Sequence, residues 1–313
     1  MCRVVAVIVM SVMLLSILLG ASLEAAEQER ALRMIIVRNR KEAQDIRQQL
    51  RRGASFSALA YQKSIGPERN QWGYSGVVKL DDVQQKLRPV LQRLQPGQIS
   101  DVIEIGPRYI LVKVISAQIP RYYEKAGRAL LAGKTSEALQ ALQAALKLEK
   151  DNVESYIKLA FAYEQTQQYT EAIKSLEKAQ RYVPDVAQIA IFRGTIYTNA
   201  AIQQKNTAYG QQAVKAYRQA MRLDKRLTPA IHFGLGRLYL LALKQPEKAL
   251  KYLKKAVKTT PRVPTVYGML IQAYYDTKRY QQAWEQLRFA QSLGYEFPKL
   301  LDALHKVKET SQR

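Results

Sequence analysis

The chain has 313 residues, a length that corresponds to about two domains at roughly 150 residues each. Its 49 Lys and Arg against 26 Asp and Glu give a formal net charge of +23, and its hydrophobic content of 47% excludes a disordered polyelectrolyte. The single cysteine, Cys2, excludes an intramolecular disulfide framework and a multi-cysteine metal cluster. The two histidines, His232 and His305, cannot complete a typical zinc site by themselves, so we predict no metal and no cofactor.

The N-terminal segment has the composition of an export signal. Residues 4–21 are almost wholly apolar, Arg3 precedes them, and small residues follow. This order is typical of a secretory signal peptide, and the same run also reaches the lower length limit for a membrane span. We predict that residues 1–26 are a cleaved signal peptide or a retained membrane anchor. The protein is then exported, to the periplasm or to the outer side of an inner membrane that residues 4–21 anchor.

Residues 27–118 have the pattern of a small α+β domain. A β-rich run over 33–37 precedes two segments with apolar residues at helical spacing, 41–52 and the residues after the N-cap Ser55. Glycines at 73–76 indicate a loop.

The second half of this segment contains one more helix and two strands. The helix is expected to begin at Asp81 and to be kinked by Pro89. Strand-like runs over 101–105 and 109–115 are joined by Gly106-Pro107, which is a hairpin signal. Helices between terminal strands predict an α+β sheet domain.

Two motifs in this domain resemble the parvulin family of peptidyl-prolyl isomerases, the PpiC type. Gly53-Ala-Ser-Phe-x-x-Leu-Ala60 followed by Ser64 is similar to the family run GxDFxxLAxxxS. Leu94-Gln-Pro-Gly-Gln-Ile-Ser100 is similar to its turn LxPGxIS, and Gly76 matches the glycine of GDLGWF. The resemblance implies a parvulin fold and a site that binds proline-containing peptides.

The catalytic part of the resemblance is degenerate. Where family members carry a histidine, an Asp or Cys, and a second histidine, the matching positions are Met34, Tyr74 and Tyr109. The family's apolar proline pocket corresponds to Val83 and Leu87. Isomerisation lowers a barrier of about 18–20 kcal/mol by binding the twisted amide, without covalent chemistry. Two alternatives therefore remain: the domain is a binding scaffold without activity, or it is a weak, divergent isomerase.

Residues 119–296 contain an internal repeat. The string Ala-x3-Leu-x2-Ala-x4-Pro occurs at 172–184 and at 249–261, and related strings begin at Ala138, Ala213 and Ala283. The interval from Ala138 to Ala172 equals the interval from Ala249 to Ala283. This pattern resembles the tetratricopeptide repeat, whose period is about 34 residues, and implies an all-α solenoid of about five repeats. An insertion in 200–212, about seven positions beyond the period, is expected between two helices, and residues 297–313 are expected to be a capping helix and tail.

Such solenoids bind partners in a groove lined by the first helix of each repeat. By spacing, seven residues are candidates to line this groove, or else to pack inside the array: Tyr123, Ile157, Phe161, Ile191, Phe233, Leu240 and Tyr275. Of the net charge, +16 lies in residues 119–313. We therefore expect an acidic or unfolded protein or peptide partner, or an anionic membrane surface, and no nucleic acid.

Two functions follow from these patterns. The first is an exported chaperone or assembly scaffold that binds extended or partner polypeptides through the repeat groove and a degenerate parvulin domain. The second is an active, divergent peptidyl-prolyl isomerase whose substrates are recruited by the repeats.

Overall fold

The computed structural model describes residues 29–310. It divides into two compact units, one that ends at Ala162 and one that begins at Tyr163, and each is described by itself. The predicted signal or anchor segment, 1–26, and the last three residues of the predicted tail lie outside the described residues. Within the described part, no helix is both long enough and apolar enough to cross a membrane.

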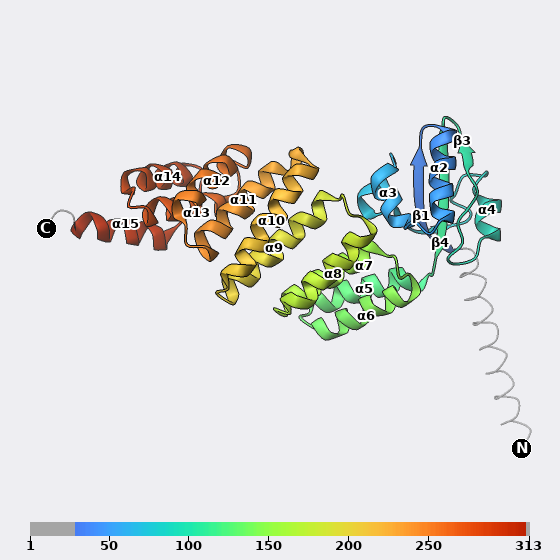
Figure 1. Cartoon of the computed structure of the whole chain (residues 1–313), viewed down its shortest axis with the longest axis horizontal. Helices are drawn as coiled ribbons and strands as arrows, with labels where there is room; N and C mark the ends of the chain where they lie inside the picture. The colour runs from blue at the N-terminus through green and yellow to red at the C-terminus, as the bar shows by residue number, and fades with distance from the viewer. Residues whose placement is uncertain (1–28, 311–313) are drawn as a thin grey trace, which may run out of the picture. The chain divides into compact units, whose positions relative to one another are not determined.

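The first unit contains a four-stranded antiparallel sheet with strand order β2-β1-β4-β3 (Figure 1). The strands are β1 (Glu29–Val37), β2 (Tyr74–Lys79), β3 (Ile103–Ile105) and β4 (Arg108–Ile115). The terminal strands and the hairpin at Gly106 confirm the α+β prediction. Strand β2 lies where a loop was predicted, because Gly73 and Gly76 adopt positive φ (+79° and +85°) and let the chain pair with β1 across a register irregularity.

Three helices cover the sheet: α2 (Arg40–Arg51), α3 (Phe56–Lys63) and α4 (Arg88–Arg93). The side chains of Asn39 and Ser55 cap α2 and α3 by accepting hydrogen bonds from backbone N–H groups in the first turn. The predicted third helix is shorter than expected and starts at Arg88, so that Pro89 lies in its first turn and does not kink it. Proline suits this position because the first N–H groups of a helix have no intrahelical partner.

Alternation along β1 separates two cores. Ile35 and Val37 pack with residues of α2 and α3 on one face of the sheet. Leu32 and Ile36 pack with Leu91 of α4 on the other face. Since successive side chains of a strand point to opposite faces, each residue of β1 and β4 belongs to one of two separate environments.

The first unit also contains the beginning of the helical array, α5 (Gln118–Leu131), α6 (Thr135–Leu148) and most of α7 (Val153–Gln165). Ala31 of β1 and Ile115 of β4 form a buried cluster with Ile119 of α5 and Ala145 of α6. The first helices of the array therefore share a core with the sheet, and the division between units falls at 162/163, whereas the sequence pattern changes at 118/119.

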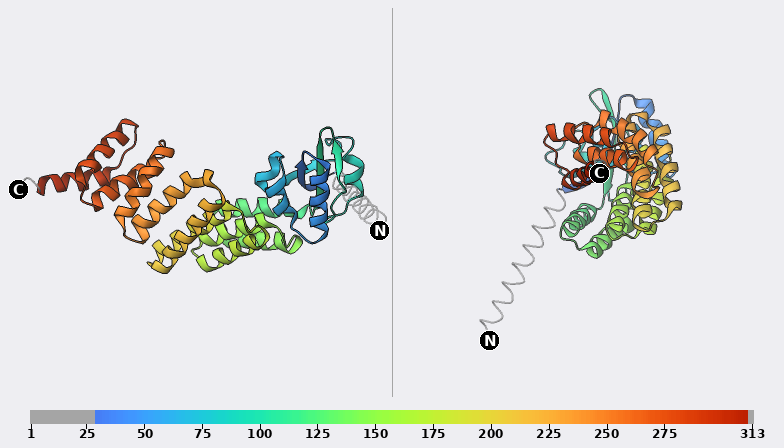
Figure 2. Two further views of the ribbon diagram at one scale, coloured as in Figure 1. Left: turned by 45° about the horizontal axis from the view of Figure 1, so that its top comes forward. Right: turned by 90° about the vertical axis from the view of Figure 1, so that its left-hand side faces the viewer.

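The second unit is entirely helical in its described residues. It contains α8 (Tyr169–Tyr182), α9 (Ala187–Gln203), α10 (Thr207–Leu223), α11 (Thr228–Arg237), α12 (Pro246–Thr259), α13 (Pro264–Asp276), α14 (Tyr280–Ser292) and α15 (Pro298–Thr310). Helices α9 and α10 lie side by side, as do α11 and α12, and α13 and α14 (Figure 2). The extra residues expected between α9 and α10 do not form a loop but lengthen both helices to 17 residues.

Small residues occur where these helices approach closely. The alanines of the repeat string are fully buried, among them Ala213, Ala249 and Ala283. Gly194 and Gly234 lie against the buried ring of Tyr217, and a Cβ at either position would lie 2.7 Å from that ring. The positions that the repeat string predicts to be small are therefore the positions buried between the helices.

Candidate functional site

An apolar cleft of about 660 Å³ opens on the α4 face of the sheet. Its floor is formed by alternate residues of the two central strands, Leu32, Met34 and Ile36 of β1 and Ile110 and Val112 of β4. Its walls come from the segment that leads into α4 and from the β3–β4 hairpin. The charged or amide side chains that line it are Asp82, Gln84 and Arg108. A volume of this size is typical of sites that enclose part of a peptide or a small ligand.

Three of the residues predicted from the sequence line this cleft together: Met34, Val83 and Leu87. Tyr109 does not line it, because its ring packs against the core formed with α2 and α3 on the other face. In the register of the sheet, Tyr109 pairs with Val37, while Ile110 pairs with Ile36. Ile110 is thus the residue of β4 that shares the cleft face with Met34, one position from the residue predicted.

Tyr74 also lies away from the cleft. Its ring meets Tyr123 edge-on, with ring centroids 6.2 Å apart, and the guanidinium of Arg33 lies 5.9 Å from its centroid. Burial, together with the nearby carboxylate of Glu154, raises the pKa of Tyr74. Of the three positions matched to polar parvulin residues, only Met34 faces the cleft.

The floor of the cleft carries no side chain that could act as an acid, a base or a nucleophile. All floor residues are apolar, and the ionisable groups Asp82 and Arg108 belong to the surrounding loops. An apolar cleft can stabilise a twisted prolyl amide relative to water, because twisting reduces the polarity of the amide. This chemistry requires no metal and no covalent intermediate.

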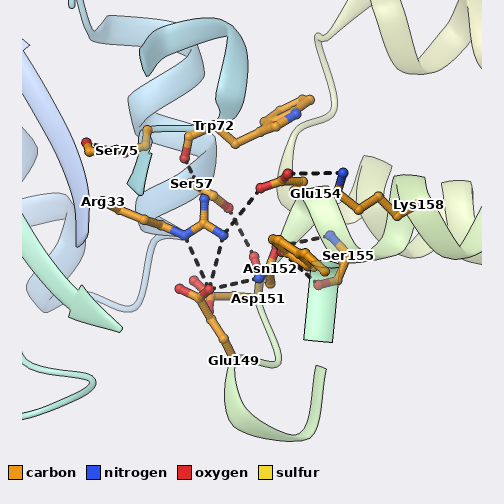
Figure 3. A network of polar contacts seen from close by, with 12 residues as sticks. Arg33, Ser57, Trp72, Ser75, Glu149, Asp151, Asn152, Glu154, Ser155 and Lys158 are labelled. Carbon is orange, nitrogen blue, oxygen red and sulfur yellow. Dashed lines mark hydrogen bonds and ion pairs between the residues drawn. The ribbon is translucent and has the colours of Figure 1, made fainter. Parts of the chain in front are cut away.

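A second site, a buried polar network, was not foreseen from the sequence (Figure 3). Arg33 of β1 has no exposed surface. Its Nε donates to Oε2 of Glu149 at 3.2 Å, and its Nη1 donates to the carbonyl oxygen of Trp72 at 3.0 Å. Its Nη2 lies 3.2 Å from Glu149 and 3.9 Å from Glu154. The guanidinium thus joins β1 to the residues that link α6 and α7.

Lys113 of β4, which pairs with Arg33 in the sheet register, binds the other oxygen of the same carboxylate. Its Nζ donates to Oε1 of Glu149 at 2.7 Å and lies 3.6 Å from Asp151. Asn152 donates to Oε2 of Glu149 at 2.9 Å. Two charges of the sheet and one amide therefore converge on Glu149, so its buried negative charge is fully paired.

Further contacts extend this network on both sides. The carbonyl oxygen of Asp151 accepts hydrogen bonds from Ser55 and Ser57, each at 3.2 Å. The hydroxyl of Tyr123 on α5 lies 3.0 Å from both Asn152 Oδ1 and Ser155 Oγ. We call Arg33, Lys113, Glu149, Asp151, Asn152, Glu154, Tyr123 and Ser155 the sheet–repeat network.

Burial dominates the electrostatics of the network. It raises the pKa of Glu154, although Arg33 and Lys158 favour the charged form. Burial also raises the pKa of Tyr123, so its hydroxyl remains protonated at neutral pH. For Arg33, burial disfavours the cation, but Glu149 and its neighbours more than offset this and raise the pKa. Arg33 therefore stays charged.

The seven groove candidates fall into three groups. Tyr123 is half-buried and belongs to the sheet–repeat network. Ile157, Ile191 and Leu240 are buried, so they pack inside the helical layers instead, as the spacing also allowed. The remaining three keep exposed surface: Phe161, Phe233 and Tyr275.

The histidines do not form a site with each other. His232 is buried, and burial together with Lys255 lowers its pKa. His305 contacts Trp284 edge-on. Within residues 29–310 no cluster of three His, Cys, Asp or Glu side chains could hold a metal ion.

Family models match both halves of this architecture. Residues 24–116 match the PPIC-type PPIASE domain, described as a rotamase. Residues 129–194, 210–264 and 238–292 match tetratricopeptide repeat models. The chain is a PPIC-type rotamase domain followed by tetratricopeptide repeats. The residues that line the cleft therefore belong to the rotamase domain, and so does strand β1, which carries Arg33 of the network.

Each of the curated relatives described next matches less than half of this chain. The chain is 33% identical over 76 residues to the chaperone SurA of Bordetella avium, which covers 24% of this chain and 15% of SurA. It is 32% identical over 135 residues to human Superkiller complex protein 3, which covers 41% of this chain. The chain spans only 8% of the length of that protein.

Among solved structures, that of pilF from Pseudomonas aeruginosa is similar in fold. The similarity has a TM-score of 0.50 at 20% identity and covers 62% of this chain and 86% of pilF. At this identity the comparison concerns the helical fold alone.

Proposed function

We propose that the protein is a chaperone or assembly scaffold that binds extended, apolar or proline-containing segments in the rotamase cleft and holds a partner polypeptide on its repeats. The observation that carries this proposal is the cleft itself, with an apolar floor between β1 and β4 and charged residues only around it. Such a surface buries apolar side chains reversibly, at about 25 cal/mol for each Å² removed from water.

The absence of ionisable groups from the floor of the cleft favours binding over catalysis. Met34 of β1 and Ile110 of β4 lie in the floor of the cleft, where each supplies an apolar surface but no proton donor or acceptor. The similarity to a chaperone over 76 residues of this chain supports the same function. A weak isomerase remains the second candidate, because an apolar cleft can by itself favour the twisted amide.

The charge of the repeats supports an acidic partner. Helix α12 carries five exposed lysines: Lys248, Lys251, Lys254, Lys255 and Lys258. Its one acidic residue, Glu247, pairs with Arg279 at 3.1 Å. This face attracts carboxylates at long range, and raising the salt concentration is expected to weaken the binding of an acidic partner.

We also propose that the protein acts outside the cytoplasm, on the evidence of the apolar run at 4–21 and the small residues after it. Mass spectrometry of the intact protein from its native host tests this. A mass that lacks residues 1–26 is expected for a cleaved signal, and a full-length mass in the membrane fraction would indicate an anchor. A full-length mass in the cytoplasmic fraction would contradict export.

The cleft is tested by titrating the full chain with a fluorescent proline-containing tetrapeptide and by measuring cis–trans exchange of the same peptide. Saturable binding without faster exchange is the expected result. Val83→Asp, which places a charge in the wall of the cleft, is expected to weaken binding about tenfold.

The matched control is Val77→Asp. Val77 lies on β2, is 46% exposed and does not line the cleft, so this variant should bind the peptide as the unmodified chain does. Faster exchange that Val83→Asp abolishes and Val77→Asp preserves would establish the isomerase instead. Equal binding by both variants would remove the cleft as the site.

A further inference from the structure

The last helix of the array occupies the position of the first helix of another repeat. Helix α15 packs on α13 and α14, as α13 packs on α11 and α12. Pro298 and Leu304 each follow their counterparts, Pro264 and Leu270, by one repeat period. In the described part of the chain, no second helix pairs with α15. Among residues 29–310, no segment covers the surface on which such a helix would lie.

A pocket of about 560 Å³ lies on this surface, between α14 and α15. Tyr280, Trp284 and Arg288 line it from one face of α14. His305 and Lys308 line it from α15, and Leu304 closes its base. We call this pocket the terminal groove.

Comparison with the preceding repeat shows that Trp284 in the groove is less covered than its counterpart. Leu250, which follows the repeat alanine in α12, is 2% exposed. Trp284 stands at the same position one repeat later, yet it is only half-buried and meets His305 edge-on, with centroids 5.0 Å apart. A large aromatic side chain thus remains partly uncovered at a position that is covered in the repeat before it. Tryptophan at such a position is typical of the anchors that dominate binding energy.

The polar lining of the groove is basic. His305 and Lys308 stand where α13 has the buried Ile271 and Tyr274. Among the described residues that line the groove there is no Asp or Glu, whereas Arg288 and Lys308 both are lining residues. A second copy of α15 carries three lysines against two acidic residues, Asp302 and Glu309, so its net positive charge does not complement these cations.

We propose that the terminal groove binds an amphipathic helix of a partner protein. Apolar side chains of this helix cover Trp284, and carboxylates beside them bind Arg288 and Lys308. The partner helix thereby takes the place of the second helix of a repeat. This site is separate from the rotamase cleft, so the proposal stands independently of the activity proposed for the cleft.

The test uses the full chain and a labelled synthetic helix with leucines along one face and glutamates beside them. Fluorescence anisotropy should show saturable binding. Trp284→Ala is expected to weaken it about tenfold or more, and so is Arg288→Glu combined with Lys308→Glu. Circular dichroism of each variant checks that the repeats remain folded.

Two matched controls separate the groove from general charge attraction. Lys215→Glu with Arg222→Glu makes the same change of charge on α10, which does not line the groove, and should leave binding within about twofold. A peptide of the same composition in scrambled order should bind at least about tenfold more weakly.

Three results would overturn the proposal. The first is the absence of saturable binding by the leucine–glutamate helix. The second is equal binding of the scrambled peptide, or equal loss of binding in the α10 variant. The third is concentration-dependent self-association, measured by sedimentation, that Trp284→Ala abolishes, which would assign the groove to a second copy of this chain. The proline tetrapeptide should bind all groove variants normally, so failure here is distinct from failure of the cleft.

Discussion

The two faces of the central strands β1 and β4 carry opposite chemistry. Arg33 and Met34 are neighbours in β1, yet Arg33 is enclosed in the sheet–repeat network while Met34 lines the open cleft. In β4, Lys113 faces the network, and Val112 faces the cleft. Arg33 and Lys113 thus bind the residues that link α6 and α7, while the residues of β1 and β4 that form the floor of the cleft are apolar.

This difference shows how one sheet can join a second structural element on one face and leave an apolar cleft on the other. Buried charges require fully formed partners, since an isolated ion in the protein interior costs several kcal/mol. Glu149 meets this requirement through Arg33, Lys113 and Asn152. The network therefore specifies one arrangement of the sheet and α6–α7, whereas the apolar floor of the cleft contains no charge that requires a partner.

The largest effect, on the free energy of unfolding, is expected from Glu149→Leu. This change leaves Arg33 and Lys113 without their shared carboxylate and should lower the free energy of unfolding of the first unit by about 3–5 kcal/mol. Urea unfolding followed by circular dichroism measures it. The control is Glu124→Leu, which removes an exposed ion pair with Arg128 and should change the free energy by less than about 0.5 kcal/mol. Similar small effects of both variants would mean that the network does not join the sheet to the repeats.

An intermediate effect, on peptide affinity, is expected from histidine substitutions at two neighbouring positions of β4. Ile110→His introduces a polar ring into the floor of the cleft and should weaken binding of the proline tetrapeptide about tenfold. Tyr109→His changes the opposite face and should leave the affinity within about twofold. Both titrations are made at pH 8, where an unperturbed histidine is neutral. The reverse order of effects would place Tyr109, not Ile110, at the cleft.

The smallest effect is expected in the pH dependence of stability that arises from Glu154. Because burial raises the pKa of this carboxyl in the folded state, its charged form destabilises the fold above that pKa. As the pH falls through the raised pKa toward the ordinary value of 4.5, the carboxyl binds a proton and this destabilisation is lost. Glu154→Gln should therefore be more stable than the unmodified chain at pH 8, with a difference that shrinks toward pH 4.5.

Urea unfolding at pH 8, 6 and 4.5 measures this difference. Glu124→Gln, at an exposed position of α5, provides the control and should show no comparable change with pH. A stability advantage of Glu154→Gln that grows as the pH falls would contradict the assignment, because it would require a lowered pKa.

Much of the architecture could be predicted from local patterns. The period of the repeat string located the helices of the array, and buried alanines such as Ala249 confirm its register. The parvulin motifs located the domain that carries the cleft, together with Met34, Val83 and Leu87. Strand β2 was missed because its glycines suggest a loop, and only pairing with β1 makes it a strand.

The site was harder to predict where it depends on register. A shift of one residue in a strand moves a side chain to the other face of the sheet, so Tyr109 was expected where Ile110 lies. Sequence spacing alone did not identify which of the two residues faces the cleft. The hydrogen-bonded register with β1 decided it.

By itself, the sequence determined the order of the two folds, the positions of the repeat helices and the apolar character of the cleft, because these depend on periodicities within a few residues. Only the tertiary structure decided that Arg33 meets Glu149, 116 residues away, and that Tyr123 joins them. No local pattern encodes such contacts, since each partner alone resembles a solvated surface residue. Their burial becomes favourable only when the sheet and the first repeat pack together and every charge finds its partner.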